Sequence, residues 1–438
     1  MESLVGYPRI LVISNNSFSK TGSNGRTLTG FFQSWPKSNV AQFCISTDAP
    51  NYDVCENYYL VTDKSAFDGF LRFKKAKRCD IESNLNSKGN SKVTHNKVVH
   101  KSPSTVWIRN FIWQPERWKS KEFIKWVDDF NPEVILLMNS DSVFILKVAI
   151  SLSRNRKIPL VLFNTEGFYF FKKPFIESSR LEYLLFKFYQ TYYRKVFVNL
   201  MKKVSLTFYA NSKLQEDYEN VFGGHCMILY TGSSIIPPET PKSFNAQSPV
   251  FSYIGNLAYS RIDALIEVAE VLQSISSDYV LDVYGRYDEE IKEKAKAVKG
   301  LCLKGFISSD KVLETINKSD VLFHAETQDP KWAEALKYGF STKIADSVSS
   351  GKCFVMYSSR DIAGADYIVK TGAGWHASNM DDLRKVLLSI INDKEERDKV
   401  LEIARETAIK HHQAQTNSNV FQEALTEVLK NHENSYHC

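Results

Sequence analysis

The most constraining feature of the sequence is an alternation that continues along almost its whole length. Short apolar runs rich in β-branched and aromatic residues are separated by longer stretches with the periodicity of amphipathic helices. Parallel strands need such helical crossovers between them, so the alternation predicts a doubly wound α/β fold. The candidate strands are Arg9–Ser14, Val40–Ser46, Glu133–Met138, Pro159–Asn164, Val204–Ala210, Met227–Tyr230, Val250–Ile254, Val280–Tyr284, Leu301–Phe306, Val321–His324 and Cys353–Tyr357.

The length of 438 residues predicts two domains of roughly 200 residues each. Between the halves, the stretch from Pro237 to Pro241 contains three prolines, which can continue neither a helix nor a central strand. We therefore place the domain boundary there, with domains at 1–236 and 242–417. Ser418–Lys430 then reads as a final helix within residues 418–438.

Composition excludes several classes of protein. With 43% hydrophobic and 24% charged residues the chain is globular, and a net charge of +6 permits an anionic partner without identifying one. Seven cysteines show neither a Cys-x-x-Cys pair nor a zinc-like spacing, which predicts a reduced, cytoplasmic protein. We find no signal peptide and no apolar run near the ~18 residues that span a bilayer. A lipid-linked substrate would have to be reached from the membrane surface.

A glycine-containing loop followed by a short predicted helix, between residues 337 and 352, has the residues of a diphosphate-binding site. Ser341 and Thr342 are small, so backbone N–H groups at the helix start can approach an anion. Lys343 adds a positive charge. Asp346 lies one helical turn further on the same face, where its carboxylate can accept hydrogen bonds from a ribose diol.

This run resembles the nucleotide-sugar loop of family 4 glycosyltransferases, and more closely the branch that makes bacterial surface polysaccharides. In that branch a Ser-Thr-Lys triplet precedes the helix. The commoner family pattern has two acidic residues, and their positions are occupied here by Tyr338 and Asp346. The first carboxylate is therefore missing, and its role is not transferred to Tyr338.

The resemblance covers most of the second domain well and the first domain loosely. It implies two Rossmann-like domains facing each other across a cleft (GT-B type). The first domain would bind the acceptor, the second would bind the nucleotide sugar, and the final helix would pack back across the first domain. Because open α/β sheets bind ligands at the carboxyl ends of their strands, the chemistry would occur in the cleft.

Further donor contacts are expected where strands of the second domain end. Gly255 and Asn256 follow one strand, and Arg261 stands where the family has a Lys-Gly pair that grips the diphosphate. A guanidinium suits that task because it can bind phosphate bidentately. A surface arginine at a helix start is the alternative explanation.

The resemblance also assigns a nucleobase site and a sugar contact. Gly285 and Arg286 follow one strand, Phe306 and Ile307 follow the next, and the family holds the base at these positions; both are also ordinary strand ends. Glu326 would contact donor-sugar hydroxyls, and a solvent-facing glutamate is an equal alternative.

In the first domain, Gly25 and Arg26 lie in a strand-to-helix loop that can cradle a phosphate or a sugar, although any such turn can carry glycine. Glu166 follows a buried strand, where a carboxylate can accept the proton of an acceptor hydroxyl or stabilise positive charge at an anomeric carbon. The alternative for Glu166 is a structural role as cap of the next helix.

Two segments of the first domain carry clustered cations. The stretch from Lys74 to Ser104 is rich in Lys, Asn and Ser and reads as a mobile insertion, either solvated or touching anionic lipid. The stretch from Leu181 to Lys203 mixes aromatic residues with Lys and Arg, as an interfacial helix does. A core helix with a basic outer face explains much of the same pattern.

The predicted function is transfer of a sugar from a nucleoside-diphosphate sugar to a hydroxyl acceptor. Glu166, Arg261 and Lys343 would be the catalytic residues. The sequence has no Asp-x-Asp motif, so the reaction should be independent of metal and of any other cofactor.

From the resemblance we expect retention of configuration, and an acceptor that is a lipid-linked glycan of capsule or O-antigen biosynthesis. The partners would be the donor, the acceptor and the inner membrane surface, and not nucleic acid. Two alternatives stay open: a sugar-nucleotide 2-epimerase, and a catalytically inactive nucleotide-binding scaffold.

Overall fold

The computed structural model describes residues 6–20, 23–46, 50–79, 102–114, 116–174, 178–240 and 242–437. The chain forms two compact units: unit 1 contains residues 1–210, 214–229 and 418–438, and unit 2 contains residues 211–213 and 230–417. The chain enters unit 2 at Tyr230, before the proline-rich stretch that we took as the boundary. Leu229 still packs in the core of unit 1, whereas the Tyr230 ring packs against Tyr367 of unit 2.

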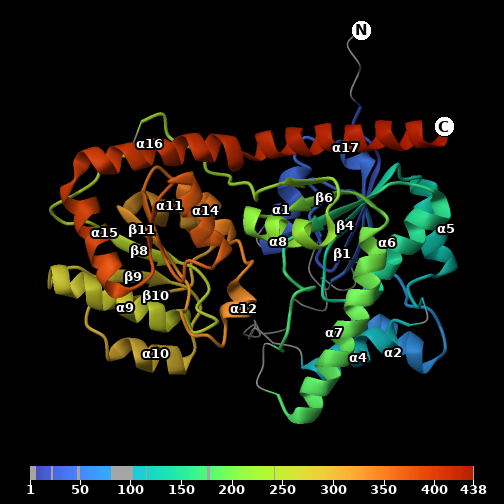
Figure 1. The fold of residues 1–438 in the computed structure, drawn as a ribbon, viewed down its shortest axis with the longest axis horizontal. Coiled ribbons are helices and arrows are strands. Elements are labelled where there is room, and N and C mark those ends of the chain that lie inside the picture. Colours follow the sequence, from blue (N-terminus) through green and yellow to red (C-terminus); the bar gives the residue numbers. More distant parts are fainter. Residues whose placement is uncertain are drawn as a thin grey trace, which may run out of the picture. The chain divides into compact units, whose positions relative to one another are not determined.

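Unit 1 is built on one sheet of seven parallel strands in the order β3-β2-β1-β4-β5-β6-β7 (Figure 1). β1 lies at its centre, with Ile10 paired to Val40 on one side and to Val134 on the other. All residues of β1, β2, β4 and β5 are buried, as expected when helices cover both faces of a parallel sheet. The strands are β1 (Ile10–Ser14), β2 (Val40–Ile45), β3 (Asn57–Val61), β4 (Val134–Met138), β5 (Leu160–Asn164), β6 (Val204–Tyr209) and β7 (Cys226–Ile228).

The helices around this sheet have local start signals that the sequence supplies. Ser102, Ser120 and Ser179 cap the helices that follow them, each side-chain oxygen accepting a hydrogen bond from a backbone N–H of the first turn. The helices are α1 (Ser23–Phe31), a 3₁₀ turn (Lys37–Asn39), α2 (Asp63–Leu71), α4 (Pro103–Ile112), α5 (Lys121–Phe130), α6 (Val143–Arg156), α7 (Arg180–Met201), α8 (Ser212–Phe222) and α17 (Ala414–His437).

The core of unit 1 is completed by a helix from the far end of the chain. Phe421 of α17 contacts the rings of Phe31, Phe32, Trp35 and Phe208, with centroid separations of 5.4–5.6 Å. Ala424, Leu425 and Val428 follow it into the same core at helical spacing. The helix is longer at both ends than the stretch 418–430 that the sequence indicated.

Unit 2 has a sheet of six parallel strands in the order β10-β9-β8-β11-β12-β13. The strands are β8 (Phe251–Ile254), β9 (Leu281–Tyr284), β10 (Leu301–Gly305), β11 (Val321–Ala325), β12 (Cys353–Tyr357) and β13 (Trp375–Ala377). The helices are α9 (Arg261–Ile275), α10 (Glu289–Lys296), α11 (Ser309–Lys318), α12 (Ala333–Leu336), α13 (Thr342–Val348), α14 (Ala363–Thr371), α15 (Met380–Asn392) and α16 (Lys394–His411).

The predicted fold class is confirmed, because both units are parallel, doubly wound α/β structures of the Rossmann type. Every candidate strand is present, and β3 and β13 are additional. Of the expected insertion, residues 80–101 lie outside the described residues. Its last residues were misassigned, because Ser102 caps α4 and Pro103 begins it.

Candidate functional site

The loops at the carboxyl edge of the unit 2 sheet approach one another closely after β8 and β9. A Cβ atom on Gly285 would lie 2.3 Å from the carbonyl oxygen of Gly255. A Cβ atom on Gly255 would lie 2.6 Å from the Tyr253 hydroxyl. Gly285 is thus required by packing against the Gly255 backbone, and Gly255 by packing against the Tyr253 side chain.

The loop after β8 delivers Arg261 into a buried group of polar side chains. Nε and Nη2 of Arg261 each donate a hydrogen bond of 2.7 Å to the Glu326 carboxylate, a bidentate pair. His324 contacts Glu326 through Nε2 at 3.0 Å, and because a carboxylate only accepts, Nε2 carries the proton. The Arg261 and Glu326 side chains are 12% and 7% exposed.

The charge of Glu326 is stabilised by these partners. Burial alone would raise the pKa of its carboxyl, but the Arg261 guanidinium and the His324 hydrogen bond lower it to about 2. Glu326 is therefore not the solvent-facing glutamate considered from the sequence. Its position shows a role in holding Arg261, while contact with a sugar stays a prediction.

The predicted diphosphate loop lies at the same edge, since a helix connecting two parallel strands runs back and begins at their carboxyl ends. Ser341 caps α13, its hydroxyl accepting from the backbone N–H of Lys343 at 3.3 Å. Thr342 is buried, and Lys343 is half-buried. Asp346 is also buried and accepts a hydrogen bond of 2.8 Å from Ser233.

The predicted nucleobase positions form a flat, solvent-facing pair. Arg286 follows β9, and its guanidinium lies 4.3 Å from the centre of the Phe306 ring, which follows β10. Phe306 is 61% exposed although it is a large apolar residue. The backbone N–H of Gly285 donates a hydrogen bond of 3.0 Å to the carbonyl of Gly305, which precedes Phe306 and Ile307, and this bond joins the two loops. The pair offers a stacking surface of the kind that binds planar rings.

In unit 1, Glu166 lies just beyond the carboxyl end of β5. Burial away from water raises the pKa of its half-buried carboxyl to about 7. The Glu166 carbonyl accepts a hydrogen bond from Tyr218, which fixes the backbone there. The alternative in which Glu166 caps the next helix is wrong, because Ser179 caps α7.

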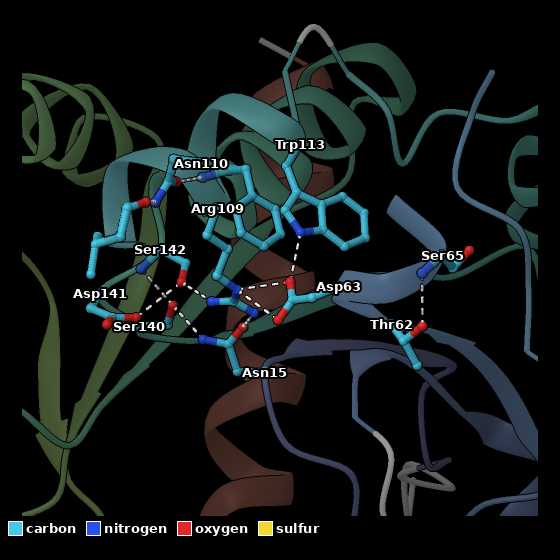
Figure 2. A network of polar contacts seen from close by, with 12 residues as sticks. Asn15, Thr62, Asp63, Ser65, Arg109, Asn110, Trp113, Ser140, Asp141 and Ser142 are labelled. Carbon is cyan, nitrogen blue, oxygen red and sulfur yellow. Dashed lines mark hydrogen bonds and ion pairs between the residues drawn. The ribbon is translucent and has the colours of Figure 1, made fainter. Parts of the chain in front are cut away.

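A polar network at the same edge of unit 1 was missed by the sequence analysis (Figure 2). Arg109 of α4 donates from Nε to both oxygens of Asp63 at 2.9 and 3.1 Å, and from Nη1 to Ser142 at 2.6 Å. Trp113 also donates to Asp63, at 2.9 Å. The sequence offered one signal for this site: Thr62 can cap a helix, which places Asp63 at the start of that helix.

Close packing alone explains why glycine stands at position 25. It is buried, and a Cβ atom there would lie 2.5 Å from the carbonyl oxygen of Ser17 and 2.7 Å from Cβ of Ser19. The first turn of α1 therefore packs directly on the loop after β1. Contact of Gly25 or Arg26 with a donor stays a prediction.

The described residues contain neither a metal-binding cluster nor a membrane-spanning helix. No group of three or more His, Cys, Asp or Glu side chains in the described part of the chain could hold a metal ion. Among the helices described, none combines the length and apolar character needed to cross a membrane.

Comparison with solved structures shows similarity over almost the entire chain. Sucrose-phosphate synthase from Thermosynechococcus elongatus aligns with a TM-score of 0.62 and 9% identity, covering 96% of this chain and 99% of that one. Anabaena HepE in complex with UDP and glucose gives 0.59 and 14%, covering 96% and 100%. The lipopolysaccharide outer core galactosyltransferase WaaB gives 0.56 and 14%, covering 95% and 99%.

The sequence of unit 2 matches a known protein family. No curated protein sequence matches the chain. Residues 239–407, which lie within unit 2, match the family described as Glycosyl transferases group 1. Unit 2 therefore contains a domain similar to this family, and the match supports glycosyl transfer as the activity.

Proposed function

We propose that the protein transfers a sugar from a nucleoside-diphosphate sugar to a hydroxyl acceptor, with the donor bound by unit 2 and the acceptor by unit 1. The observation that carries the proposal is the oriented Arg261 at the carboxyl edge of the unit 2 sheet. Its bonds to Glu326 and Asn256 leave one N–H on each terminal nitrogen for a ligand. The structure of HepE with UDP and glucose, a protein of the same fold, supports this choice of donor.

The other donor residues divide by chemistry. Lys343 at the start of α13 supplies a second positive charge for the diphosphate, with the small residues Ser341 and Thr342 admitting the anion to backbone N–H groups. Asp346 suits the ribose hydroxyls. Arg286 and Phe306 would stack on the base.

In this mechanism no metal is required, because Arg261 and Lys343 offset the charge that develops on the departing diphosphate. Glu166, with its pKa near 7, accepts the proton of the attacking hydroxyl or stabilises positive charge at the anomeric carbon. Retention of configuration and a place in surface polysaccharide synthesis rest on the resemblance of the 337–352 loop to family 4 enzymes.

We further propose that unit 1 binds the surface of an anionic membrane. α4 packs against both α2 and α7, and these three helices lie together in unit 1 (Figure 1). Large apolar side chains are exposed on all three, and we call them the apolar face: Phe67, Leu71, Ile108, Phe111, Leu181, Leu184 and Phe188. Exposed cations, including Arg72, Lys74, Lys75, Arg180 and Lys187, accompany them. Apolar residues mixed with cations suit anionic lipid.

The predicted helix Leu181–Lys203 thus has two sides. Tyr189, Tyr193, Phe197 and Leu200 of α7 are buried in unit 1, as the core-helix alternative expects. Its first turns carry Leu181, Leu184 and Phe188 of the apolar face. The core-helix explanation thus applies to the later turns, and the interfacial explanation stays a prediction for the first turns.

The donor proposal is tested by thermal shift with UDP, GDP, CDP and ADP and their sugars, because a ligand that binds only the folded protein raises its melting temperature. In calorimetry with the best nucleotide, Lys343→Ala or Arg261→Ala should weaken binding by about 1.5–3 kcal/mol. Lys385→Ala, at a surface position of α15, is the matched control. Unchanged affinity in both site variants would refute the assignment.

The membrane proposal is tested by flotation with vesicles of phosphatidylcholine and phosphatidylglycerol. The protein should float at low salt and be released as salt rises, since each nearby Lys or Arg contributes about 1 kcal/mol. Phe111→Ser with Phe188→Ser should reduce flotation, while Leu313→Ser, an exposed residue of unit 2, should not. A wild-type protein that stays in the soluble fraction at low salt contradicts the proposal.

A further inference from the structure

The network around Asp63 lies along the edge of the sheet that also carries Glu166. Asn15 follows β1, Asp63 begins α2 directly after β3, and Ser140 and Ser142 follow β4. β4 is hydrogen-bonded to β5, the strand that leads to Glu166. In a parallel sheet all of these positions lie at one edge, where ligands bind.

Arg109 is held from several sides and is nearly buried, with its side chain 13% exposed. Besides its bonds to Asp63 and Ser142, its guanidinium contacts Asn15 through Nη2 at 3.4 Å and lies 5.1 Å from the centre of the Phe144 ring. Phe144 is stacked on Trp113 at 4.8 Å. The guanidinium therefore has one orientation.

Asp63, by contrast, is 54% exposed although its carboxylate is fixed. Arg109 and Trp113 orient it, and the Thr62 hydroxyl caps α2 by accepting from the backbone N–H of Ser65 at 3.0 Å. Arg109 and Trp113 both point at the Asp63 carboxylate (Figure 2). Because Asp63 is half-exposed, this arrangement presents an oriented carboxylate to solvent.

The charges of the network select among ligands. Arg109 is neutralised by Asp63, and the half-buried Asp141 adds a further carboxylate beside Ser142. A phosphate or carboxylate ligand would thus approach the carboxylates of Asp63 and Asp141, while the Arg109 charge is already compensated by Asp63. Hydroxyl groups fit better, since a carboxylate accepts from them and the Asn15 side chain both donates and accepts.

We infer that Asp63 and Asn15, positioned by Arg109, bind hydroxyl groups of a neutral sugar at the accepting end of the acceptor. The inference rests on the proposed function, which places the acceptor in unit 1, and it adds the chemical class of the group recognised. Arg109 is a positioning residue here.

The test is saturation-transfer NMR of the full chain with methyl glucosides, galactosides and mannosides, compared with glucose 1-phosphate. At least one neutral hexoside should receive saturation. Asp63→Asn should weaken its binding about 10- to 100-fold, as expected for loss of a hydrogen bond to a charged group. Asp68→Asn, at an exposed position of the same helix, should bind as the wild type does.

Further variants separate this role from a general effect on folding. Arg109→Lys keeps the charge but loses the fork, so it should weaken hexoside binding while nucleotide affinity stays unchanged. Asn15→Ala provides a second route if Asp63→Asn fails to fold.

Three results would overturn the inference: no hexoside binding by the wild type, equal binding by Asp63→Asn, or binding of glucose 1-phosphate in place of hexosides. Each leaves nucleotide binding intact. Failure of the proposed function would instead appear as absence of any nucleotide binding.

Discussion

The carboxyl edges of the two sheets each hold an arginine against a carboxylate, and the two pairs differ in which partner meets solvent. In unit 2 both members are buried, at 12% for Arg261 and 7% for Glu326. In unit 1 Arg109 is 13% exposed and Asp63 is 54% exposed. An arginine paired with an acid therefore produces an enclosed charge in one unit and a solvent-exposed anion in the other.

The difference shows that an arginine–carboxylate pair has no fixed function. A buried pair has lost the hydration of both ions and depends on mutual contact, so removing one partner strands the other. A half-exposed acid keeps water on one side and can exchange that water for ligand hydroxyls. Burial of the acid, more than the pairing itself, separates the two cases.

The largest expected effect concerns Glu166, the acid of unit 1 that differs from both pairs because burial raises its pKa to about 7. Glu166→Gln keeps the shape and removes the charge, so turnover should fall by about 10²–10⁴. Donor affinity should be unchanged, since the proposed donor residues are in unit 2. Steady-state kinetics with calorimetry check both statements.

The pH profile sharpens this test. If the ionised carboxylate is the active form, wild-type turnover should decline as pH falls below about 7, and the residual rate of the Gln variant should lack that limb. Full activity in the Gln variant would assign Glu166 to structure alone.

The second prediction contrasts the pairs directly. Glu326→Gln leaves the Arg261 guanidinium buried without its counter-charge, so the free energy of unfolding should fall by about 3–5 kcal/mol. Asp63→Asn should lower it by less, because Asp63 is 54% exposed and Arg109 keeps its hydrogen bond to Ser142. Urea denaturation of both variants measures the difference, and equal losses would break the comparison.

The third and smallest effect is the pH dependence of the free energy of unfolding, to which His412 of unit 2 and Glu166 of unit 1 should contribute with opposite signs. Burial lowers the pKa of His412 in unit 2 to about 4, helped by the neighbouring His411, while Asp346 and the Thr231 carbonyl oppose the shift. The unfolded chain protonates this histidine near pH 6.5, so stability falls as pH drops from about 6.5 to 4, by up to about 3 kcal/mol.

For Glu166 the sign is reversed. The folded state binds its proton up to about pH 7 and the unfolded state only to about 4.5, so stability falls as pH rises through that window. The free energy of unfolding of His412→Gln and of Glu166→Gln is measured from pH 4 to 7. Each variant should lack one of these two pH dependences. A difference from wild type that does not vary with pH would contradict either assignment.

Much of the fold could be predicted because buried parallel strands are continuous apolar runs, which stand out from amphipathic helices. The missed strands show the limit of that signal. β3 begins with Asn57-Tyr58-Tyr59, and β13 is only the three residues Trp375–Ala377. Both lie at the edges of their sheets, where a strand pairs with one neighbour only.

The candidate site was predictable where its chemistry is local. Ser341, Thr342 and Lys343 are consecutive, so a helix start with a cation can be read from the sequence. The pairing of Arg261 with Glu326, and of Arg109 with Asp63, joins residues 65 and 46 positions apart. Such contacts are set by strand order and helix packing, which no local pattern contains.

Unit 1 also has an unusual relation to the order in which the chain is synthesised. Its sheet is complete when β7 has left the ribosome, yet Phe421, the ring that joins its aromatic cluster, is made only after the whole of unit 2. Until then a hydrophobic surface on the nascent protein lacks its cover. The half that is translated first is consequently the half that finishes folding last.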